Sequence, residues 1–256
     1  MKNRFSELIK NPFFYRCGDA YRATHTVFPV EYHGENYIVK MNSTKAFLAN
    51  LYYTAVDSLF FDTRKLSTGN RRLKTEAEKL RKLDGHCAPM LYAQGYGILV
   101  KEFLFGADYK HFNIARQRDS LEQIVHTVKE IHDRGVIIGD ANVKNYMDGH
   151  WIDFDGVFKP LGGHDDKSLD LLKLIYSTYA SASSEDNGKR EALTYLMALD
   201  IKKYYNNESV LNTLGFMMYP AKPLWRMWLA TKIPRNGVLL KELRKMFLPK
   251  HLRKSF

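Results

Sequence analysis

The stretch that decides the fold is Gly135-Val-Ile-Ile-Gly-Asp-Ala-Asn-Val-Lys-Asn145, followed closely by Trp151-Ile-Asp-Phe-Asp155. It contains Asp140, an Asn five residues later at Asn145, and a further Asp eight residues beyond that at Asp153. Phosphoryl transfer from ATP needs a carboxylate that accepts or orients the proton of the acceptor hydroxyl, and oxygen ligands that hold magnesium ions. The spacing therefore predicts Asp140 as the catalytic carboxylate, with Asn145 and Asp153 as magnesium ligands.

The residues around this stretch predict a helix, a buried loop and a tight hairpin. Asp119 or Ser120 can cap a helix. The apolar residues that then recur at helical spacing are Leu121, Ile124, Val125, Val128 and Ile131. Gly135 stands where a helix-ending glycine is typical, and Asp148-Gly149 is a strong hairpin signal. This local structure would gather the three polar side chains at one end. The alternative is a solvated loop that happens to contain Asp and Asn.

Around these loops the chain resembles the protein-kinase-like superfamily. It is most similar to two compact branches, the lipopolysaccharide core sugar kinases and the small kinase of the tRNA-threonylcarbamoyladenosine (KEOPS) machinery. The resemblance rests on Ile131-His-Asp-Arg-Gly-Val-Ile-Ile-Gly-Asp140, on Ile152-Asp-Phe-Asp155 and on Asp166-Lys-Ser-Leu-Asp-Leu171, and it covers about residues 15–180.

That resemblance implies an α+β, two-lobed protein-kinase-like fold with a small β-rich N-lobe and a helical C-lobe. We expect a nucleotide-binding N-lobe at residues 1–104 and a C-lobe with the catalytic and metal loops at 105–219. A basic amphipathic C-terminal tail is expected at 220–256. A chain of 256 residues is long enough for one such domain with its own core.

The upstream half offers a Lys and a Glu for the nucleotide phosphates. Tyr37-Ile-Val-Lys40 is an apolar strand that ends in Lys, as the phosphate-binding Lys of a kinase small lobe requires. Residues 75–83 have a helical pattern in which Glu76 falls on the edge of the apolar face and Glu78 points away from it. Glu76 is therefore predicted to position Lys40. The alternative is two surface glutamates in a charged helix.

The remaining nucleotide contacts are implied by the resemblance, with ATP and Mg²⁺ as the cofactors. Ile98–Gly106 resembles the strand and hinge that hold adenine, which implies that the backbone of Glu102 and of Leu104 pairs with the base edge. The phosphate-covering loop is the poorest match, because Cys17–Thr24 offers one Gly where the kinase pattern is G-x-G-x-x-G. A loop with fewer glycines is expected to be stiffer.

Several departures from the protein-kinase pattern concern the acceptor. Ile138 stands where many relatives have His, and Asn142 stands where Ser/Thr protein kinases usually have Lys. Asp155 replaces a Gly found in many kinases and is expected to add charge near the metal. Only Gly156–Asp165 separates the metal loop from the next helix, without an A-P-E segment. An extended peptide would have little to lie on, which favours a small or sugar-like acceptor and is also compatible with the KEOPS-type branch.

The positive charge is concentrated at the C-terminal end. The chain carries +11, and Pro220–Phe256 contains ten basic residues and one acid, so that this segment carries +9 and the rest +2. With Trp225 and Trp228 among the charges, the segment suits an anionic membrane surface, or alternatively RNA phosphates. A third interpretation is an amphipathic helix packed on the C-lobe. The apolar residues of that helix are Leu239, Leu243, Met246 and Phe247.

The cysteines, the N-terminus and the apolar runs of the sequence indicate in which cellular compartment the protein works. The two cysteines, Cys17 and Cys87, do not suggest a disulfide framework, and they fit free thiols in a reducing compartment. The N-terminus lacks the apolar core of a signal peptide, and no apolar run is long enough to span a bilayer. We therefore expect a cytoplasmic protein with peripheral contact to the inner face of the cytoplasmic membrane.

Together these features predict an ATP-dependent kinase whose acceptor is a hydroxyl of a lipopolysaccharide inner-core sugar. Three alternatives stay open. They are an atypical Ser/Thr protein kinase of a KEOPS-like tRNA-modification complex, a cytosolic small-molecule kinase, and a scaffold that binds nucleotide without turnover.

Overall fold

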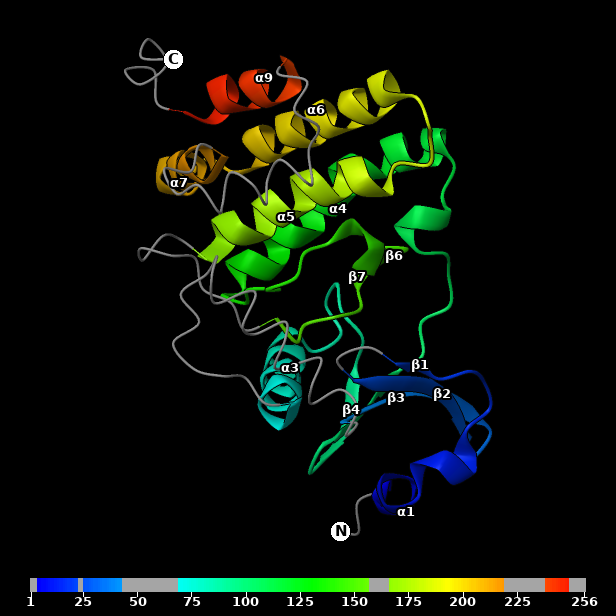
Figure 1. Cartoon of the computed structure of the whole chain (residues 1–256). Coiled ribbons are helices and arrows are strands. Elements are labelled where there is room, and N and C mark those ends of the chain that lie inside the picture. The colour runs from blue at the N-terminus through cyan, green and yellow to red at the C-terminus, as the bar shows by residue number, and fades with distance from the viewer. Residues whose placement is uncertain (1–3, 23–24, 43–68, 157–165, 219–237, 249–256) are drawn as a thin grey trace.

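The computed structural model describes residues 4–22, 25–42, 69–156, 166–218 and 238–248. Figure 1 shows two bodies, a sheet with one long helix at its side and a stack of helices, with a small hairpin between them.

The smaller body is built on a five-stranded antiparallel sheet. In spatial order its strands are β1 (Tyr21–Arg22), β2 (Thr26–Tyr32), β3 (Glu35–Met41), β5 (Ile98–Glu102) and β4 (Leu91–Gly95). Strand β2 alternates between buried and less buried side chains, which is the pattern of a sheet with one face on a core. The turn between β2 and β3 uses His33 at φ 54° and Gly34 at φ 76°, a left-handed pair typical of tight hairpins.

Among the described residues, three helical segments belong to this body. They are α1 (Ser6–Lys10), the 3₁₀ turn η1 (Pro12–Tyr15) and α3 (Gly69–Leu83). Helix α3 begins before the predicted residues 75–83 and ends with them. It buries Leu73, Ala77 and Leu80 on one face, so its apolar stripe is the one that the sequence predicts.

The larger body is helical. Its elements are η2 (Tyr109–His111), α4 (Ile114–Asp133), η3 (Val143–Asn145), the hairpin of β6 (Tyr146–Met147) and β7 (His150–Trp151), α5 (Asp166–Ser181), α6 (Asn187–Tyr204), α7 (Glu208–Met218) and α9 (Val238–Phe247). The hairpin turn has Asp148 at φ 39° and Gly149 at φ 91°, as the Asp-Gly signal predicts.

The predicted start of α4 was wrong. The helix begins at Ile114, and its cap is Asn113, whose Oδ1 accepts from the N–H of Arg116 at 2.9 Å. Asp119 and Ser120 lie inside the helix, because Asn113 already satisfies its first turn and the intervening Gln117 is buried. The end is as predicted, since Gly135 has φ 66° just after the last turn.

Part of the predicted tail is packed helix. In α9, Leu239, Leu243 and Phe247 are buried in the core of the helical body, and a Cβ on Gly215 of α7 would lie 2.8 Å from the backbone of Phe247. The amphipathic-helix interpretation therefore holds for α9. Residues 220–237 and 249–256, including Trp225 and Trp228, lie outside the described residues.

The described residues thus have the predicted α+β, two-lobed architecture, with a small β-rich lobe and a helical lobe. The boundary at residue 104 stays a prediction. Within the described ranges, no helix has the length and apolarity needed to cross a bilayer.

Candidate active site

Lys40 and Glu76 form a buried ion pair in the sheet lobe. Lys40 lies on β3, and its Nζ is 2.7 Å from Glu76 Oε2 on α3. The two side chains are 5% and 0% exposed. Glu78, in contrast, is exposed. The structure therefore places the predicted Glu, and not its neighbour, beside Lys40.

Lys101 is a second cation on Glu76, and the sequence interpretation missed it. Its Nζ is 2.8 Å from Glu76 Oε1 and donates to the carbonyl of Ile152 at 2.7 Å. Lys40 pairs with Leu99 across β3 and β5, so Lys101, two residues further, points to the same face of the sheet. This alternation was the signal that could have identified Lys101.

Two Asp residues complete a group that we call the Lys40 cluster. Its members are His25, Lys40, Glu76, Lys101, Asp153 and Asp155. Lys40 Nζ is 2.7 Å from Asp153 Oδ1 and 3.2 Å from Asp155 Oδ2. His25 Nδ1 is 3.1 Å from the same oxygen of Asp155. Asp155 was expected to add charge near the metal. Here its carboxylate is engaged by Lys40 and His25, and it is 9% exposed.

Charges within the Lys40 cluster shift pKa values in opposite directions. Burial alone would lower the pKa of Lys40, but the carboxylates of Asp153, Asp155 and Glu76 outweigh it and hold that pKa well above its ordinary value. Burial would raise the pKa of Asp155, but Lys40 and His25 hold it well below its usual range. Desolvation and the charge of Asp155 raise the pKa of Asp153. Asp153 is therefore a carboxylate on which additional positive charge would be favourable.

Asp140 is held by a Lys from a different helix. Its side chain is 36% exposed, and its Oδ1 is 3.1 Å from Nζ of Lys173 on α5. Lys173 is buried and also donates to the carbonyl of Gly139 at 2.7 Å. Asn142, at the position where protein kinases usually have Lys, caps η3 by accepting from the N–H of Lys144 at 3.2 Å. In this chain α5 supplies the cation beside Asp140.

Asn145 connects the two loops. Its Nδ2 donates to the carbonyl of Asp140 at 3.2 Å, which leaves the amide oxygen as the atom for a metal. Its own carbonyl accepts from the N–H of Ile152 at 2.9 Å, one residue before Asp153. The three residues predicted to act together are thus on two loops that are hydrogen-bonded to each other.

A second group, the Asp170 anchor, consists of His132, Asp170 and Tyr205. The carboxylate of Asp170 accepts from the backbone N–H groups of Ile138 and Gly139, both at 2.8 Å. It also lies 3.1 Å from His132 Nε2, while Tyr205 Oη lies 2.7 Å from Nδ1 of that ring. All three side chains are buried. The loop before Asp140 is therefore fixed to α5 through backbone N–H groups, which do not depend on the side chain at position 138.

Lys79 is a further residue that the sequence interpretation did not single out. From α3 its Nζ donates to three backbone carbonyls, of Ile138 at 2.9 Å, Phe154 at 3.0 Å and Gly156 at 2.7 Å. Burial lowers the pKa of Lys79 to about 8. The helix that carries Glu76 is therefore tied directly to both loops of the site.

The two loops also cross at van der Waals distance. A Cβ on Gly139, whose φ is 88°, would lie 2.5 Å from the carbonyl oxygen of Gly156. Any side chain at either position would separate the loops. The relative position of Asp140 and Asp153 depends on this crossing.

The predicted adenine contacts lie at the end of β5. The N–H of Glu102 donates to the carbonyl of Met90 at 2.9 Å, and the Glu102 carboxylate accepts from the Met90 N–H at 3.0 Å. Because that N–H is used within the protein, the Glu102 group that fits a base edge is its carbonyl oxygen. Leu104 follows β5 in irregular backbone and is partly exposed.

Two other predicted segments are described in part. In the phosphate-covering loop, the structure describes residues up to Arg22, where β1 pairs with β2. Residues 23–24 lie outside the described residues, as do 157–165, on which the expectation of a short connection after the metal loop depends.

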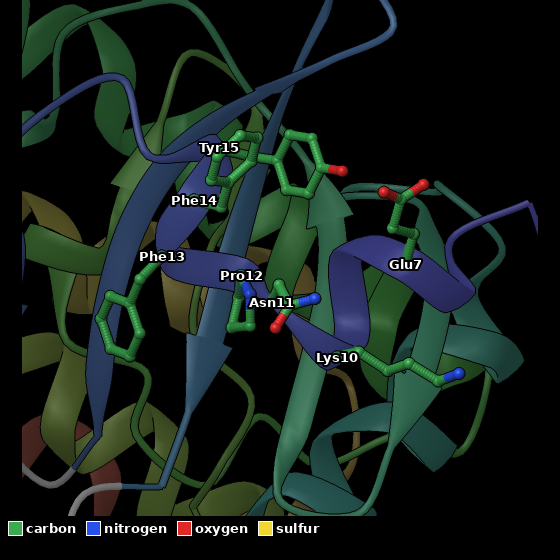
Figure 2. Close-up of a pocket in the computed structure, with 7 residues that line it drawn as sticks. All are labelled: Glu7, Lys10, Asn11, Pro12, Phe13, Phe14 and Tyr15. Carbon is green, nitrogen blue, oxygen red and sulfur yellow. The ribbon is translucent and has the colours of Figure 1, made fainter.

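A hollow of about 470 Å³ lies at the N-terminal end of the sheet lobe, on the side away from the helical lobe (Figures 1 and 2). The lining residues are Glu7, Lys10, Asn11, Pro12, Phe13, Phe14 and Tyr15. None of the residues predicted for the active site lines it. The candidate active site is therefore the Lys40 cluster together with Asp140 and Asn145.

No protein-family model matches the sequence, and no curated protein matches it. Among solved structures, the chain is similar to WaaP in complex with acyl carrier protein, with 14% identity, 93% of this chain and 92% of that chain covered, and a TM-score of 0.43. It is similar to the Mycobacterium tuberculosis PknI kinase domain, with 15% identity, coverages of 88% and 91%, and a TM-score of 0.47. It is also similar to ADP-bound aminoglycoside phosphotransferase APH(2'')-Ib, with 12% identity, coverages of 95% and 99%, and a TM-score of 0.39. At such low identities and TM-scores, the roles of the site residues rest on the chain's own geometry.

Proposed function

We propose that this chain is an ATP-dependent phosphotransferase that acts on a hydroxyl group. The observation that carries the proposal is a difference in exposure among paired carboxylates. Asp140 and Asp153 keep 36% and 34% of their side chains exposed, and each is paired with a buried Lys, Lys173 and Lys40 respectively. Glu76, which supports Lys40, is fully buried. Two accessible carboxylates held by buried cations suit a reaction in which one takes a proton and the other holds a metal.

The donors present fit magnesium. Asp153 and Asn145 offer a carboxylate and an amide oxygen, and oxygen ligands are what Mg²⁺ prefers. The raised pKa of Asp153 supports the same assignment, because a cation would stabilise its charged form. When bound, the ion supplies positive charge to the phosphates of the nucleotide.

Each remaining residue has a task that its position allows. Lys40, fixed by Glu76, would contact the phosphates as a point charge. The Glu102 carbonyl and the Leu104 N–H would pair with adenine. Asp140, oriented by Lys173, would accept the proton of the acceptor hydroxyl.

The acceptor that we propose is a hydroxyl of a lipopolysaccharide inner-core sugar. The support comes from the family resemblance of the two loops and from the charge of +9 on residues 220–256, which would suit the phosphates of an anionic glycolipid. On the strength of this charge, we propose peripheral contact with the inner face of the cytoplasmic membrane.

The decisive experiment has two arms. The purified chain is assayed for ADP production with lipopolysaccharide core acceptor, alongside Asp140→Asn as a folded control. Glycolipid from cells with and without the gene is then compared by mass spectrometry. We expect the loss of one phosphate from the core in cells without the gene. An unchanged core would reject this acceptor even if ATP turnover persists.

The tail is tested separately with liposomes and tRNA. Binding to anionic vesicles should fall steeply with salt, since each Lys or Arg near such a surface contributes about 1 kcal/mol. Replacing Trp225 and Trp228 together should weaken binding even at low salt, because that contribution is apolar. Binding to tRNA in place of vesicles would favour the KEOPS-like alternative.

A further inference from the structure

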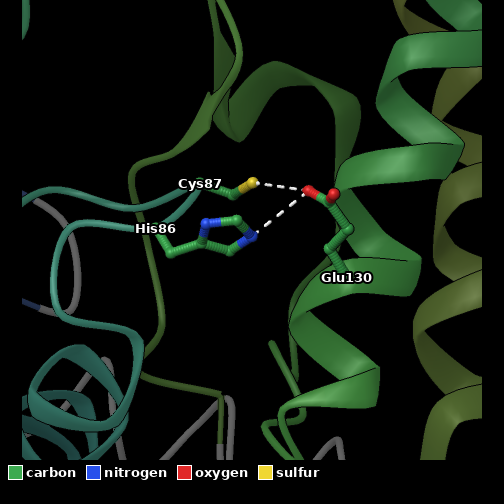
Figure 3. Close-up of side chains that lie close together, drawn as sticks. All are labelled: His86, Cys87 and Glu130. Carbon is green, nitrogen blue, oxygen red and sulfur yellow. Dashed lines mark hydrogen bonds and ion pairs between the residues drawn. The ribbon is translucent and has the colours of Figure 1, made fainter.

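A half-buried cluster of metal-type donors lies outside the candidate active site. His86 and Cys87 come from the loop between α3 and β4, and Glu130 comes from α4 (Figure 3). One donor atom from each residue lies within 4.8 Å of the other two. The side chains of His86 and Glu130 are both 36% exposed, so an ion can reach the cluster from solvent.

Two of the three separations within the cluster match those of a tetrahedral zinc site. Glu130 Oε2 is 3.3 Å from Cys87 Sγ and 3.3 Å from His86 Nε2. Zn²⁺ binds such donors at about 2.0–2.3 Å, so neighbouring donors around a tetrahedral ion lie about 3.3–3.6 Å apart. The Glu130 oxygen therefore already stands at coordination spacing from the two other donors.

Neighbouring groups hold these donors in place. The carbonyl of Cys87 accepts from the N–H of Trp151 at 2.9 Å, which fixes the loop to β7. The backbone of Cys87 is held at φ 53°, an uncommon value for a residue other than Gly. On the α4 side, His126 Nδ1 lies 3.6 Å from the other carboxylate oxygen of Glu130. A site with fixed donors needs little rearrangement to bind an ion.

We propose that His86, Cys87 and Glu130 bind Zn²⁺, with a water molecule as the fourth ligand. The Cys87 thiol loses its proton to solvent as the sulfur–zinc bond forms. The carboxylate of Glu130, which accepts a hydrogen bond from this thiol in the structure, then binds the zinc ion. A mixed sulfur, nitrogen and oxygen donor set selects Zn²⁺ over Mg²⁺, which prefers oxygen alone. The site is thus chemically distinct from the predicted magnesium ligands Asn145 and Asp153.

Zinc at this position would connect two parts of the molecule. The loop with His86 and Cys87 follows α3, which carries Glu76 and Lys79, and Glu130 lies on α4. Bound Zn²⁺ would fix the C-terminal end of α3 to the helical lobe. It would stabilise the folded chain in proportion to its concentration.

The test uses Co²⁺ as a spectroscopic probe on the chelator-treated full-length chain, with excess Mg²⁺ present to occupy oxygen-only sites. We expect one equivalent of Co²⁺ to produce a thiolate-to-cobalt charge-transfer band, and Zn²⁺ to displace it. Zinc titration in buffers of different ionisation enthalpy should show release of about one proton. At about a hundredfold excess of Zn²⁺ over its Kd, the Tm should rise by about 5–10 °C.

Three variants and a matched control separate this site from adventitious binding. Cys87→Ser should abolish the charge-transfer band and lower zinc affinity at least tenfold, and His86→Ala and Glu130→Gln should each lower it similarly. Cys17→Ser removes the other cysteine of the chain and should leave both readouts unchanged. Absence of the band in the wild type, or a band that persists in Cys87→Ser, would overturn the proposal. Should Cys87→Ser fail to fold, unaltered binding by Glu130→Gln and His86→Ala would overturn it equally.

Discussion

The Lys40 cluster and the Asp170 anchor are both groups of polar side chains built around buried carboxylates, but they differ in how completely hydrogen bonds and opposite charges match those carboxylates. In the Asp170 anchor, one carboxylate is matched by two backbone N–H groups and a His ring, and every member is buried. In the Lys40 cluster, the carboxylates of Glu76, Asp153 and Asp155 all pair with Lys40. The pKa of Asp153 is raised, and 34% of its side chain is exposed. The comparison indicates that the anchor stabilises the loop before Asp140. In the Lys40 cluster, in contrast, a bound cation would still stabilise the negative charge of Asp153.

The largest expected effect would come from the two exposed carboxylates. Asp140→Asn and Asp153→Asn should each lower phosphoryl transfer at least about a thousandfold, since one loses the proton acceptor and the other a metal ligand. Asp140→Asn should keep ATP binding, and Asp153→Asn should weaken it when Mg²⁺ is present. Single-turnover rates and nucleotide titrations measure the two quantities. Near wild-type turnover in both variants would remove the basis for calling this site catalytic.

A second prediction concerns the cation of the Lys40 cluster. Lys40→Met should lower activity by about a hundredfold or more, because the phosphates lose a point charge and three carboxylates lose their shared partner. Glu76→Gln should cost less, since Lys40 would keep both Asp partners. Glu78→Gln, on the exposed side of α3, is the matched control and should change little. An equal loss in the two Glu variants would argue against a positioning role for Glu76.

A substitution in the Asp170 anchor should lower the stability of the protein and not its catalytic rate. Asp170→Ala leaves two buried backbone N–H groups and a His ring without their acceptor, so we expect a loss of about 3–5 kcal/mol in the free energy of unfolding. Urea denaturation measures it. If Asp170→Ala instead abolishes activity at full stability, the distinction between the two groups fails.

The smallest expected effect is a pH dependence from Lys79, which lies between the two regions. Its folded-state pKa of about 8 is below the ordinary value of 10.5, so between these pH values the unfolded chain binds more protons than the folded chain. The contribution of Lys79 to stability should therefore rise with pH in this window, by about 3 kcal/mol in total. The difference in unfolding free energy between wild type and Lys79→Met, measured from pH 7 to 10, should grow accordingly. A constant difference would indicate an unshifted pKa.

The local fold around Asp140 could be predicted because its signals are local. Helical spacing, Gly135 and the Asp-Gly turn lie within a few tens of residues of Asp140, and each works through the backbone alone. The pairing of Lys40 with Glu76 also followed from one helix register. The predicted start of α4 was wrong because several residues that can cap a helix lie close together, and the sequence alone does not rank Asn113 above Asp119.

The supporting cations were missed because they arrive from distant elements. Lys173 contacts Asp140 from α5 through packing that no local pattern encodes. Strand alternation places Lys101 on the same face of the sheet as Lys40, but only the packing of α3 on that face brings Lys101 to Glu76. In the sequence, nothing distinguishes Lys79 from the other charged residues of α3. Only the folded structure shows that its Nζ donates hydrogen bonds to three backbone carbonyls. Sequence patterns therefore predicted the candidate reactive groups, and the structure shows which side chains contact and orient them.

The crossing of Gly139 and Gly156 has a consequence for finding relatives of this chain. Because neither position has room for a Cβ, a homologue that keeps the two loops in contact is confined to glycine at both, however far the rest of its sequence has drifted. Two glycines seventeen residues apart, one directly before Asp140 and one directly after the Asp-Phe-Asp step, form a steric signature. Used as a filter on distant sequences, this pair would recognise descendants of the same active-site architecture at identities too low for overall alignment.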